Sequence, residues 1–277
     1  MERRTIGAAA LAVGAVGLGC MPMSWAYSAS RQRGTESLKA VHRALDLGST
    51  LLDTADMYGP FTNELLLGRV LKERRSDAFV STKVGLLVGE QHIVANGRPG
   101  YVRRACDASL RRLQTDVIRQ LERVQQVFPV SAVQAELSVW SPEALESLLP
   151  WCAERAVGFL AAMPLGNGFL TGTLTPGQGF EPEDVRARHP RFTAEMMAAN
   201  QPIVAGLRRT AARHGENVTP AQVALAWVLA QGRHVIPVPG TKQEHWVTEN
   251  ADAAGLRLTA DDLTELGHLP TAQGSWD

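Results

Sequence analysis

Apolar and polar residues alternate along the chain in blocks that predict helices and strands in turn. From residue 36 onward, amphipathic stretches with a helical period are separated by short apolar runs rich in Val, Leu and Ile. In order, the blocks predict helix 36–47, strand 50–53, helix 63–73, strand 78–84, helix 142–155, strand 157–163, helix 220–230 behind a Thr219 cap, and strand 235–238. Such alternation is typical of parallel strands covered by helices, so the pattern predicts an α/β fold, either a barrel or a doubly wound sheet.

The first twenty residues allow two interpretations. Residues 5–6 and 11–13, separated by small side chains, predict a short hairpin, and residues 15–18 predict the strand after it. The paired arginines at 3 and 4, a small apolar stretch and Cys20 also resemble a twin-arginine export signal with a lipidation site. Small residues interrupt the apolar run too often for a typical signal, which favours the hairpin.

The stretch Ser109–Pro129 carries conflicting signals. Its apolar residues are spaced three or four apart, which predicts one amphipathic helix. Residues 115–118, Thr-Asp-Val-Ile, are poor helix formers at its centre. The stretch is therefore either one long helix or two segments joined where something is missing.

Composition narrows the classes of function. The chain has 277 residues, 45% of them hydrophobic, with 28 basic and 28 acidic side chains. It can bury a large core, and it lacks the basic surplus of a nucleic-acid-binding protein. Three widely spaced cysteines without a CxxC pair suggest neither a disulfide framework nor a zinc site, and no apolar run is long enough to cross a membrane. We therefore expect a cytoplasmic protein without a metal site and without a nucleic-acid or membrane partner.

Polar residues collect just past several predicted strands, which favours the barrel. Asp53 and Asp56 follow one strand, Lys83 ends the next, Gln134 lies in SAVQAEL, and Lys242 follows VIPVPGT. A barrel gathers the carboxyl ends of its strands around one mouth, where such enzymes keep their chemistry. The glycines of GAVGLGCMPM lack the spacing of a dinucleotide-binding fingerprint. No change in composition marks a second domain, so residues 1–277 are expected to form one barrel domain.

The sequence also predicts that Asp53, Tyr58 and Lys83 meet. Asp53 and Lys83 end consecutive predicted strands, and Tyr58 lies in the Gly-Pro loop after Asp53. A lysine ammonium beside a phenol lowers the pKa of the phenol from about 10, while an aspartate holds the lysine in place. That arrangement predicts a tyrosine able to give a proton to a carbonyl oxygen. Each residue alone has a structural alternative: a packed tyrosine, a solvated lysine and a turn-capping aspartate.

Five segments in order resemble one known family, and together they cover nearly the whole chain. They are LDTADMYG, FVSTKVG, ACDASLRRLQTDVI, MPLGNGFLTG and VIPVPGTKQEHWVTEN. The chain resembles the aldo-keto reductases. The resemblance implies a (β/α)8 barrel of TIM type that binds NADPH without a dinucleotide-binding sheet and transfers its hydride to a small aldehyde or ketone.

The resemblance also implies a role for individual residues. Tyr58 would be the proton donor, Lys83 the group that lowers its pKa, and Asp53 the partner of Lys83. The cofactor contacts would be Met21 and Gln134 at the nicotinamide, Leu165 and Gly166 at the pyrophosphate, Gly240, Thr241 and Lys242 around the 2′-phosphate, and Glu249 and Asn250 at the adenine. A lysine near that phosphate favours NADPH over NADH. Without the resemblance, Glu249 and Asn250 are better explained as an ordinary helix end.

One part of the family pattern is missing. In the family, the strand begun by TDVI ends in a catalytic histidine, and a helix and a further strand precede a helix similar to RQLERVQQVFP. Here Ile118 is followed directly by Arg119, so we infer an internal deletion of roughly 40 residues, about one and a half βα units. About six of the eight barrel strands then remain. Of the seven histidines, His92, just after Lys83, is the one expected on the face that carries the chemistry.

The deletion leads to two hypotheses from different classes. An incomplete barrel must close differently, pair with a second copy as a homo-oligomer, or be poorly stable, because its edge strands are unpaired. The intact trio favours an NADPH-dependent reductase of small carbonyl compounds. The missing histidine favours a catalytically impaired or non-catalytic relative that acts as a binding or scaffold protein. An exported lipoprotein processed at Cys20 is a third interpretation.

Overall fold

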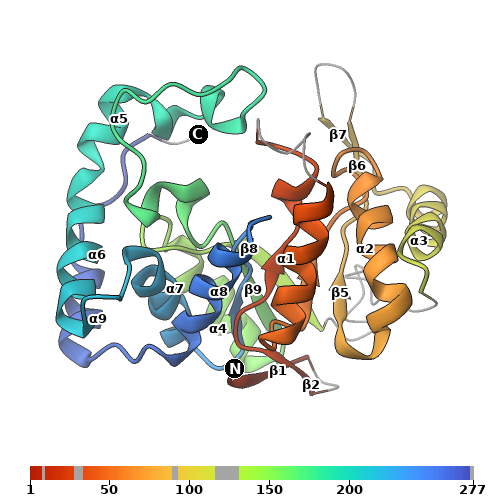
Figure 1. Ribbon diagram of the computed structural model, residues 1–277, viewed down its shortest axis with the longest axis horizontal. Helices are drawn as coiled ribbons and strands as arrows, with labels where there is room; N and C mark the ends of the chain where they lie inside the picture. The colour runs from red at the N-terminus through yellow and green to blue at the C-terminus, as the bar shows by residue number, and fades with distance from the viewer. Residues whose placement is uncertain (8–9, 28–33, 89–92, 116–130, 275–277) are drawn as a thin grey trace. The chain divides into compact units, whose positions relative to one another are not determined.

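The computed structural model shows a chain made of two compact units, each assembled from segments far apart in the sequence (Figure 1). It describes residues 1–7, 10–27, 34–88, 93–115 and 131–274. The first unit comprises residues 1–16, 121–239 and 249–277, and the second comprises residues 17–120 and 240–248. Both are α/β structures with a parallel sheet, as the alternating pattern predicts. The expectation of one domain over residues 1–277 stays a prediction.

The second unit contains a parallel sheet in the order β3, β4, β5. Its elements are β3 (Leu18–Gly19), η1 (Met21–Met23), α1 (Gly34–Asp46), β4 (Leu51–Asp53), α2 (Thr62–Arg74), η3 (Arg75–Asp77), β5 (Phe79–Ser81), β6 (Leu86–Val88), β7 (Ile93–Ala95) and α3 (Pro99–Leu113). Predicted helices 36–47 and 63–73 and strands 50–53 and 78–84 are confirmed, although β5 is shorter than expected.

The core of the second unit lies between its sheet and the helices α1 and α2. Its buried members include Leu18, Leu52, Ala40, Val41, Ala44, Leu45, Leu67, Val70 and Leu71. On α1 and α2 these residues recur at helical spacing, so each helix turns one apolar side inward. A Cβ atom at Gly68 would clash with the carbonyl oxygen of Arg112, so this glycine allows α2 and α3 to pack closely.

Helix α3 ends at Leu113 and does not continue through the Ser109–Pro129 stretch. Gln114 has a left-handed backbone with φ of 54°, and its amide bonds back to carbonyls of the last turn. The one-helix alternative is therefore wrong, because the chain leaves the helix where the poor helix formers begin. Residues 116–130, which include the predicted deletion point, lie outside the described residues.

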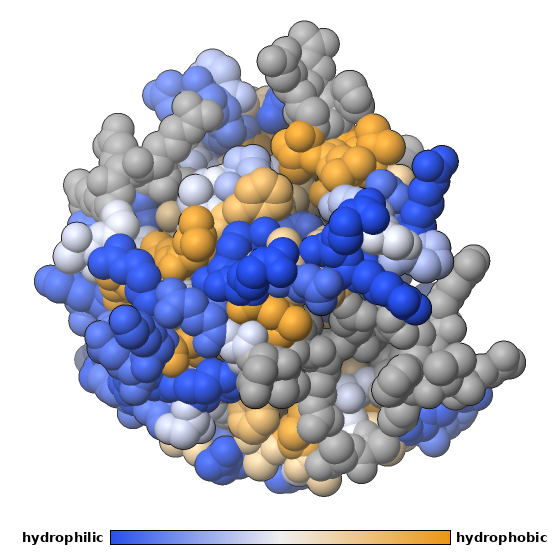
Figure 2. Space-filling model, turned by 90° about the vertical axis from the view of Figure 1, so that its right-hand side faces the viewer, coloured by the Kyte–Doolittle hydropathy of each residue, from blue (hydrophilic) through white to orange (hydrophobic). Residues whose placement is uncertain are grey.

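Strands β6 and β7 form an antiparallel hairpin that periodicity does not predict. Its large apolar residues each expose 39–51% of their surface: Leu86, Leu87, Val88, Ile93 and Val94. Figure 2 shows apolar side chains gathered near the top of the face that carries this hairpin. Since every position is exposed, there is no alternation of buried and exposed residues for a pattern to detect.

The first unit contains a second parallel sheet, in the order β10, β9, β8. Its elements are β1 (Arg3–Ile6), β2 (Leu11–Gly14), β8 (Ala132–Glu136), η4 (Glu143–Leu145), α4 (Leu148–Glu154), β9 (Gly158–Ala162), η5 (Gly166–Thr171), η6 (Val185–Arg188), η7 (Pro190–Phe192), α5 (Ala194–Ala199), α6 (Gln201–His214), α7 (Pro220–Ala230), β10 (Val235–Pro237), η8 (Ala253–Gly255) and α9 (Ala260–Gly267). Helix α8 (Glu244–Asp252) contains the return from the second unit to the first. Leu160 of β9 pairs in register with Gln134 and Ile236.

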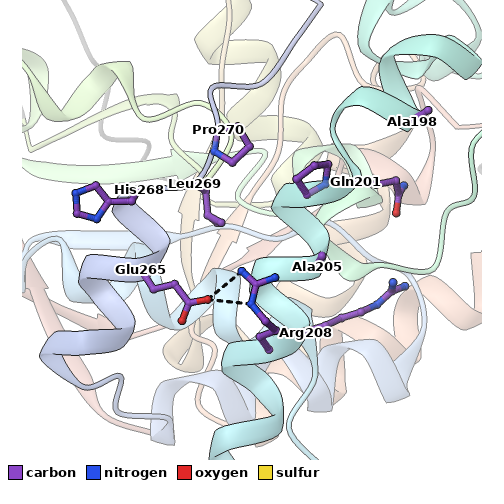
Figure 3. Close-up of a pocket in the computed structure, with 10 residues that line it drawn as sticks. Ala198, Gln201, Ala205, Arg208, Glu265, His268, Leu269 and Pro270 are labelled. Atoms are coloured by element: carbon purple, nitrogen blue, oxygen red, sulfur yellow. Dashed lines mark hydrogen bonds and ion pairs between the residues drawn. The ribbon is translucent and has the colours of Figure 1, made fainter.

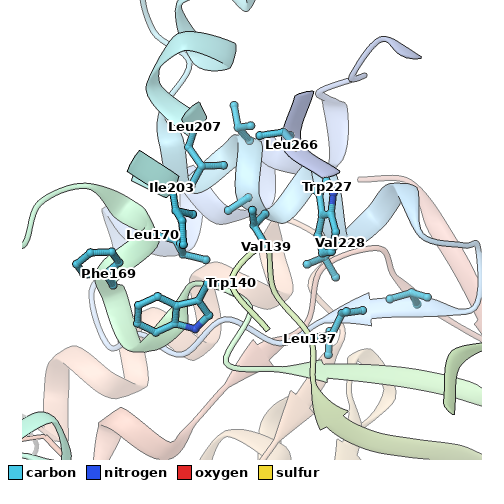
Figure 4. Close-up of a cluster of buried hydrophobic side chains, with 14 of the residues drawn as sticks. Leu137, Val139, Trp140, Phe169, Leu170, Ile203, Leu207, Trp227, Val228 and Leu266 are labelled. Atoms are coloured by element: carbon cyan, nitrogen blue, oxygen red, sulfur yellow. The ribbon is translucent and has the colours of Figure 1, made fainter. Parts of the chain in front are cut away.

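The core of the first unit is a large cluster of aromatic and aliphatic side chains (Figure 4). Among its buried members are Leu137, Val139, Trp140, Phe169, Leu170, Ile203, Leu207, Trp227, Val228 and Leu266. They come from the segment after β8, from η5 and from helices α6, α7 and α9. Trp140 stacks on Phe169 with ring centroids 5.0 Å apart. This cluster therefore ties the loop that follows β9 to the helices of the unit.

Most predicted elements of the first unit are confirmed, and two are wrong. Helix 220–230 matches α7, with the expected Thr219 cap, and strands 157–163 and 235–238 match β9 and β10. Helix 142–155 is wrong as one helix, because Pro150 lacks the N–H that a helix begun at 142 would need there. Strand 15–18 is also wrong, since the chain bends after Gly14 and pairing resumes at Leu18.

The predicted N-terminal hairpin is confirmed, and Arg4 anchors it within the first unit. Strands β1 and β2 pair antiparallel. The Arg4 guanidinium donates hydrogen bonds to the carbonyl oxygens of Gly232, Val235 and Leu229 at 2.7–3.0 Å, and the side chain is buried. One of the paired arginines therefore has a structural role. Within the described part of the chain, no helix is both long enough and apolar enough for a membrane crossing.

We expect Arg4→Met to lower the free energy of unfolding by about 2 to 4 kcal/mol, because two buried carbonyl oxygens and one part-buried carbonyl oxygen lose a charged donor. Denaturant unfolding monitored by circular dichroism measures the loss. Arg3→Met is the matched control, since Arg3 is exposed and donates one bond, to Ala12. Equal small effects of the two substitutions would show that Arg4 does not anchor the hairpin.

Candidate active site

In the second unit, Asp53 and Lys83 form an ion pair at the carboxyl end of the sheet. Strands β4 and β5 are parallel, and Asp53 pairs in register with Ser81. The Lys83 Nζ atom lies 2.7 Å from Asp53 Oδ2 and donates a second bond to the carbonyl oxygen of Thr54 at 2.9 Å. The Ser81 hydroxyl donates to Asp53 Oδ1 at 2.9 Å. Both carboxylate oxygens are therefore bonded, and the lysine is fixed in place.

Tyr58 lies beside this pair in a tight loop after β4. Its ring is 9% exposed, and Lys83 Nζ lies 5.4 Å from the ring centroid. Trp25 stacks against the ring with centroids 5.7 Å apart, and Met21 packs in the same cluster. Gly59 has a φ of +65°, which suits glycine, and a Cβ there would clash with the Thr62 hydroxyl. The structure thus brings together the predicted Asp53, Tyr58 and Lys83, with Met21 nearby.

Lys83 lowers the pKa of Tyr58 as expected, but the net shift is upward, contrary to the prediction. Burial raises the pKa of Tyr58 above its ordinary value of 10, and the positive charge of Lys83 lowers it by less. For Lys83, burial alone would lower the pKa, but the negative charge of Asp53 and the hydrogen bond to it raise the pKa above its ordinary value. At neutral pH the ammonium is therefore charged and the phenol holds its proton.

Asp56 is a second buried carboxyl group close to the tyrosine in sequence. It is 4% exposed, and burial, with the negative charge of Glu64, raises its pKa to about 6. Glu64 is fully buried and is satisfied by Arg112 at 2.6 Å and by the Thr82 hydroxyl at 2.7 Å. The backbone of Asp56 anchors the loop, since its carbonyl accepts from the Phe61 amide and its amide donates to the Lys83 carbonyl.

The predicted phosphate loop Gly240–Lys242 also belongs to the second unit. Gly240 forms a parallel bridge with Gly19, next to the turn that carries Met21. A Cβ at Gly240 would come within 2.9 Å of Pro22, so the glycine allows this close approach. Thr241 and Lys242 are each 9% exposed, and the Thr241 hydroxyl accepts from the amide of Gln243.

In the first unit, Gln134, Leu165 and Gly166 lie at the sheet and the loop that follows it. Gln134 is half-buried in the middle of β8, and Leu165 precedes the turn η5. Gly166 has a φ of +53°, and a Cβ there would come within 2.6 Å of the Trp140 ring. The loop predicted to contact the pyrophosphate therefore rests directly on Trp140.

Glu249 and Asn250 lie on α8, as the helix-end alternative expects. The Glu249 carboxylate accepts from the Thr219 hydroxyl at 2.6 Å, and its carbonyl accepts from the Gln222 side chain. These contacts give Glu249 a structural role at the start of α7. Asn250 is buried, with 7% exposure. Their predicted contact with adenine stays a prediction.

Two features of the predicted site fall outside the described residues. The segment 116–130 contains the deletion point at which the family histidine would be expected, and His92 lies in the segment 89–92. The suggestion that His92 replaces the family histidine therefore stays a hypothesis.

A groove of about 780 Å³ opens in the first unit beside α6 (Figure 3). It is lined by Ala198, Gln201, Pro202, Ala205, Arg208, Arg209, Glu265, His268, Leu269 and Pro270. Its Arg209 and Glu265 are paired at 3.0 Å. None of the predicted site residues lines this groove.

A model of the aldo/keto reductase family matches residues 15–121 and 116–269. The chain belongs to this family. The two matched segments overlap at residues 116–121, which contain the junction between Ile118 and Arg119.

Solved structures of aldo-keto reductases share the fold. A glycerol dehydrogenase from Gluconobacter oxydans is 23% identical with a TM-score of 0.81, over 96% of this chain and 94% of that one. The holo form of an aldo-keto reductase from Bacillus halodurans is 22% identical with a TM-score of 0.75, over 100% and 98%. An aldo-keto reductase from Klebsiella pneumoniae in complex with NADPH is 21% identical with a TM-score of 0.68, over 96% and 94%.

Sequence reasoning missed three residues around these sites. Ser81 precedes Lys83 by two positions in a predicted strand, and that spacing places both on one side of the strand, so the signal was present. Trp25 supports Tyr58, and Trp140 supports Gly166, and each tryptophan is far in sequence from its partner. No periodic pattern in the sequence identifies these two contacts.

We predict that Asp56→Asn stabilises the protein at neutral pH and has little effect in acid. The pKa of Asp56 is about 6 in the folded chain against 3.8 ordinarily, so the folded state binds this proton more tightly. The free energy of unfolding therefore falls as the pH rises from about 4 to about 6, by about 3 kcal/mol in all. Urea unfolding at pH 4.5 and pH 7.5 measures the difference between wild type and variant.

Asp77→Asn is the control for this experiment. Asp77 is exposed on η3, and its hydrogen bond from Arg74 lowers its pKa, so its removal should weaken the protein at pH 7.5 instead. A stabilisation by Asp56→Asn that is the same at both pH values would contradict the assignment of a raised pKa.

Proposed function

We propose that the chain is an NADPH-dependent reductase of aldehydes or ketones in which Tyr58 donates the proton. The observation that carries the proposal is the arrangement of buried Tyr58 and Asp53 with half-buried Lys83 at the end of a parallel sheet. The chain belongs to the aldo/keto reductase family, which supports a role for these side chains in carbonyl reduction.

The proposed mechanism follows from the charges of the three side chains. The hydride that adds to the carbonyl carbon would come from NADPH, when this cofactor is bound. The Tyr58 hydroxyl gives its proton to the carbonyl oxygen, so the product is an alcohol and the tyrosine becomes a phenolate. The Lys83 ammonium stabilises that phenolate, and Asp53 keeps the ammonium charged and in position.

The donor set proposed for the cofactor fits its anionic groups. Thr241 and Lys242 supply a hydroxyl and an ammonium in consecutive residues, which suits a 2′-phosphate. Leu165 and Gly166 would hold the pyrophosphate, Met21 and Gln134 the nicotinamide, and Glu249 and Asn250 the adenine. The Klebsiella pneumoniae reductases of the same fold are solved with NADPH or NADP, which supports this choice of cofactor.

We also propose that the two sheets belong to one shortened (β/α)8 barrel domain in a cytoplasmic protein. Support comes from the six parallel strands found among the described residues, three in each sheet. A homo-oligomer would complete the unpaired edges of such a barrel. The proposed substrate is a small carbonyl compound.

A second candidate function is cofactor or ligand binding without turnover. The observation in its favour is that Ile118 runs directly into Arg119, with no histidine at the family position. Removing one preorganised donor slows such reactions by about 100-fold to 1000-fold. A chain of this kind would keep affinity for NADPH and show no oxidation of it.

The test is NADPH oxidation, followed at its absorbance band, with a reactive aromatic aldehyde. We expect turnover by the wild type and a loss of about 100-fold or more in kcat for Tyr58→Phe, which lacks the donated proton. NADPH affinity should stay unchanged, because the phenol is not assigned to cofactor binding. Tyr101→Phe on α3 is the matched control and should keep full activity.

Two results would reject the reductase assignment. One is equal rates for the wild type and Tyr58→Phe. The other is NADPH binding without any turnover by the wild type, which would instead favour the second candidate function.

A further inference from the structure

The segment after α9 is fixed to the first unit by two side chains. The Asn200 amide group, 1% exposed, makes two bonds with the backbone of Gln273, accepting from its N–H at 2.8 Å and donating to its carbonyl oxygen at 3.0 Å. The next carbonyl, of Gly274, accepts from Arg191 Nε at 2.7 Å. A Cβ at Gly274, where φ is +84°, would press to 3.2 Å against the Arg191 backbone. The chain is thus held tightly against η7.

Arg191 joins this segment to the end of β8. Its Nη1 atom donates to the Ser141 hydroxyl at 2.7 Å and lies 3.6 Å from Glu136 Oε1. Its guanidinium also lies over the Trp140 ring, 4.9 Å from the centroid. One planar group therefore makes three kinds of contact at once: with a backbone carbonyl, with a polar pair and with an indole face.

Trp140 carries the contact onward to η5. The Gly166 backbone approaches the indole so closely that no side chain fits there, and Phe169 stacks on the same indole at 5.0 Å. Figure 4 shows Trp140, Phe169 and Leu170 converging at this point. The loop needs such support, because Gly166, Asn167 and Gly168 have φ values of 53°, 51° and 95° in succession. A left-handed backbone at the non-glycine Asn167 is strained and persists when surrounding packing fixes it.

We propose that Arg191 is a positioning residue for the loop Leu165–Thr171, acting through Trp140 and held in place by Gln273–Gly274. The inference rests on the proposed function, in which Leu165 and Gly166 bind the NADPH pyrophosphate. Arg191 does not touch the cofactor in this assignment. It fixes the indole on which the pyrophosphate loop rests, so that the loop is already ordered when the cofactor arrives.

Arginine suits this position and lysine does not. A guanidinium presents donors in a rigid plane and stacks flat on an aromatic ring, whereas an ammonium is a single charged point. In Arg191→Lys the charge near Glu136 is kept, but the bonds to Gly274 and Ser141 and the stack on Trp140 cannot all form together. The substitution therefore tests whether the bonds and the stacking of the guanidinium, and not its positive charge alone, position the loop.

The experiment compares the binding of NADPH and of adenosine 2′-monophosphate to full-length wild type, Arg191→Lys and Arg209→Lys. Both ligands are titrated by intrinsic fluorescence or calorimetry, with melting temperatures measured in parallel. We expect Arg191→Lys to raise the Kd for NADPH about tenfold, within the range of such coupling effects. The Kd for adenosine 2′-monophosphate, which has no pyrophosphate, should change less than about twofold. Arg209→Lys, the same change at an exposed arginine of α6, should change neither.

Several outcomes would overturn the inference. One is an unchanged Kd for NADPH in Arg191→Lys. Another is an equal loss of affinity for NADPH and for adenosine 2′-monophosphate, because an equal loss indicates general damage to the first unit. If Arg191→Lys does not fold, Asn200→Ala and Gly274→Ala, which loosen the segment that holds Arg191, must show the same selective loss. If the wild type binds no NADPH, the proposed function itself is rejected. If the wild type binds NADPH and Arg191→Lys binds it with the same Kd, only the role of Arg191 is rejected.

Discussion

The candidate chemistry of this protein depends on one ion pair, Asp53 with Lys83. The Asp53 carboxylate is largely removed from water while the Lys83 side chain keeps 36% exposure, so the cost of desolvation falls mainly on the carboxylate, and attraction offsets that cost when the geometry is good and the other polar atoms are bonded. Here Ser81 and the Thr54 carbonyl provide those further bonds. The pair forms because β4 and β5 are parallel neighbours in register, so their carboxyl ends reach the same edge. Tyr58 then lies beside a cation that two hydrogen bonds hold in place.

The parts of the fold that depend on neighbouring residues were predictable from the sequence. Helix α7 begins where the Thr219 cap predicts, and the structure adds Gln222 to complete a capping box within four residues. The apolar faces of α1 and α2 follow helical spacing. Even the meeting of Asp53 with Lys83 follows from a short-range rule, since consecutive parallel strands place their ends together.

Features that depend on packing or on distant residues were not predictable in this way. The periodic pattern predicted one helix over 142–155, although the structure has an α-helix only from Leu148 to Glu154 there. Hydrophobic spacing does not show that Pro150 lacks an N–H. The direction of the Tyr58 pKa shift required the degree of burial, which spacing does not give. Arg191, Trp140 and Gly166 are each ordinary in sequence, and their relation exists because three loops converge in the folded first unit.

The raised pKa of Tyr58 changes how the proposed chemistry works. A phenol that holds its proton at neutral pH is ready to donate, and no prior ionisation is needed. The cost appears after transfer, when a buried phenolate must be stabilised, and Lys83 is the cation beside the ring. With no histidine at the family position, the proposed carbonyl oxygen loses one source of polarisation. Strongly polarised carbonyls depend least on that donor, so under the proposed function we expect reactive aldehydes to be reduced faster than unactivated ketones.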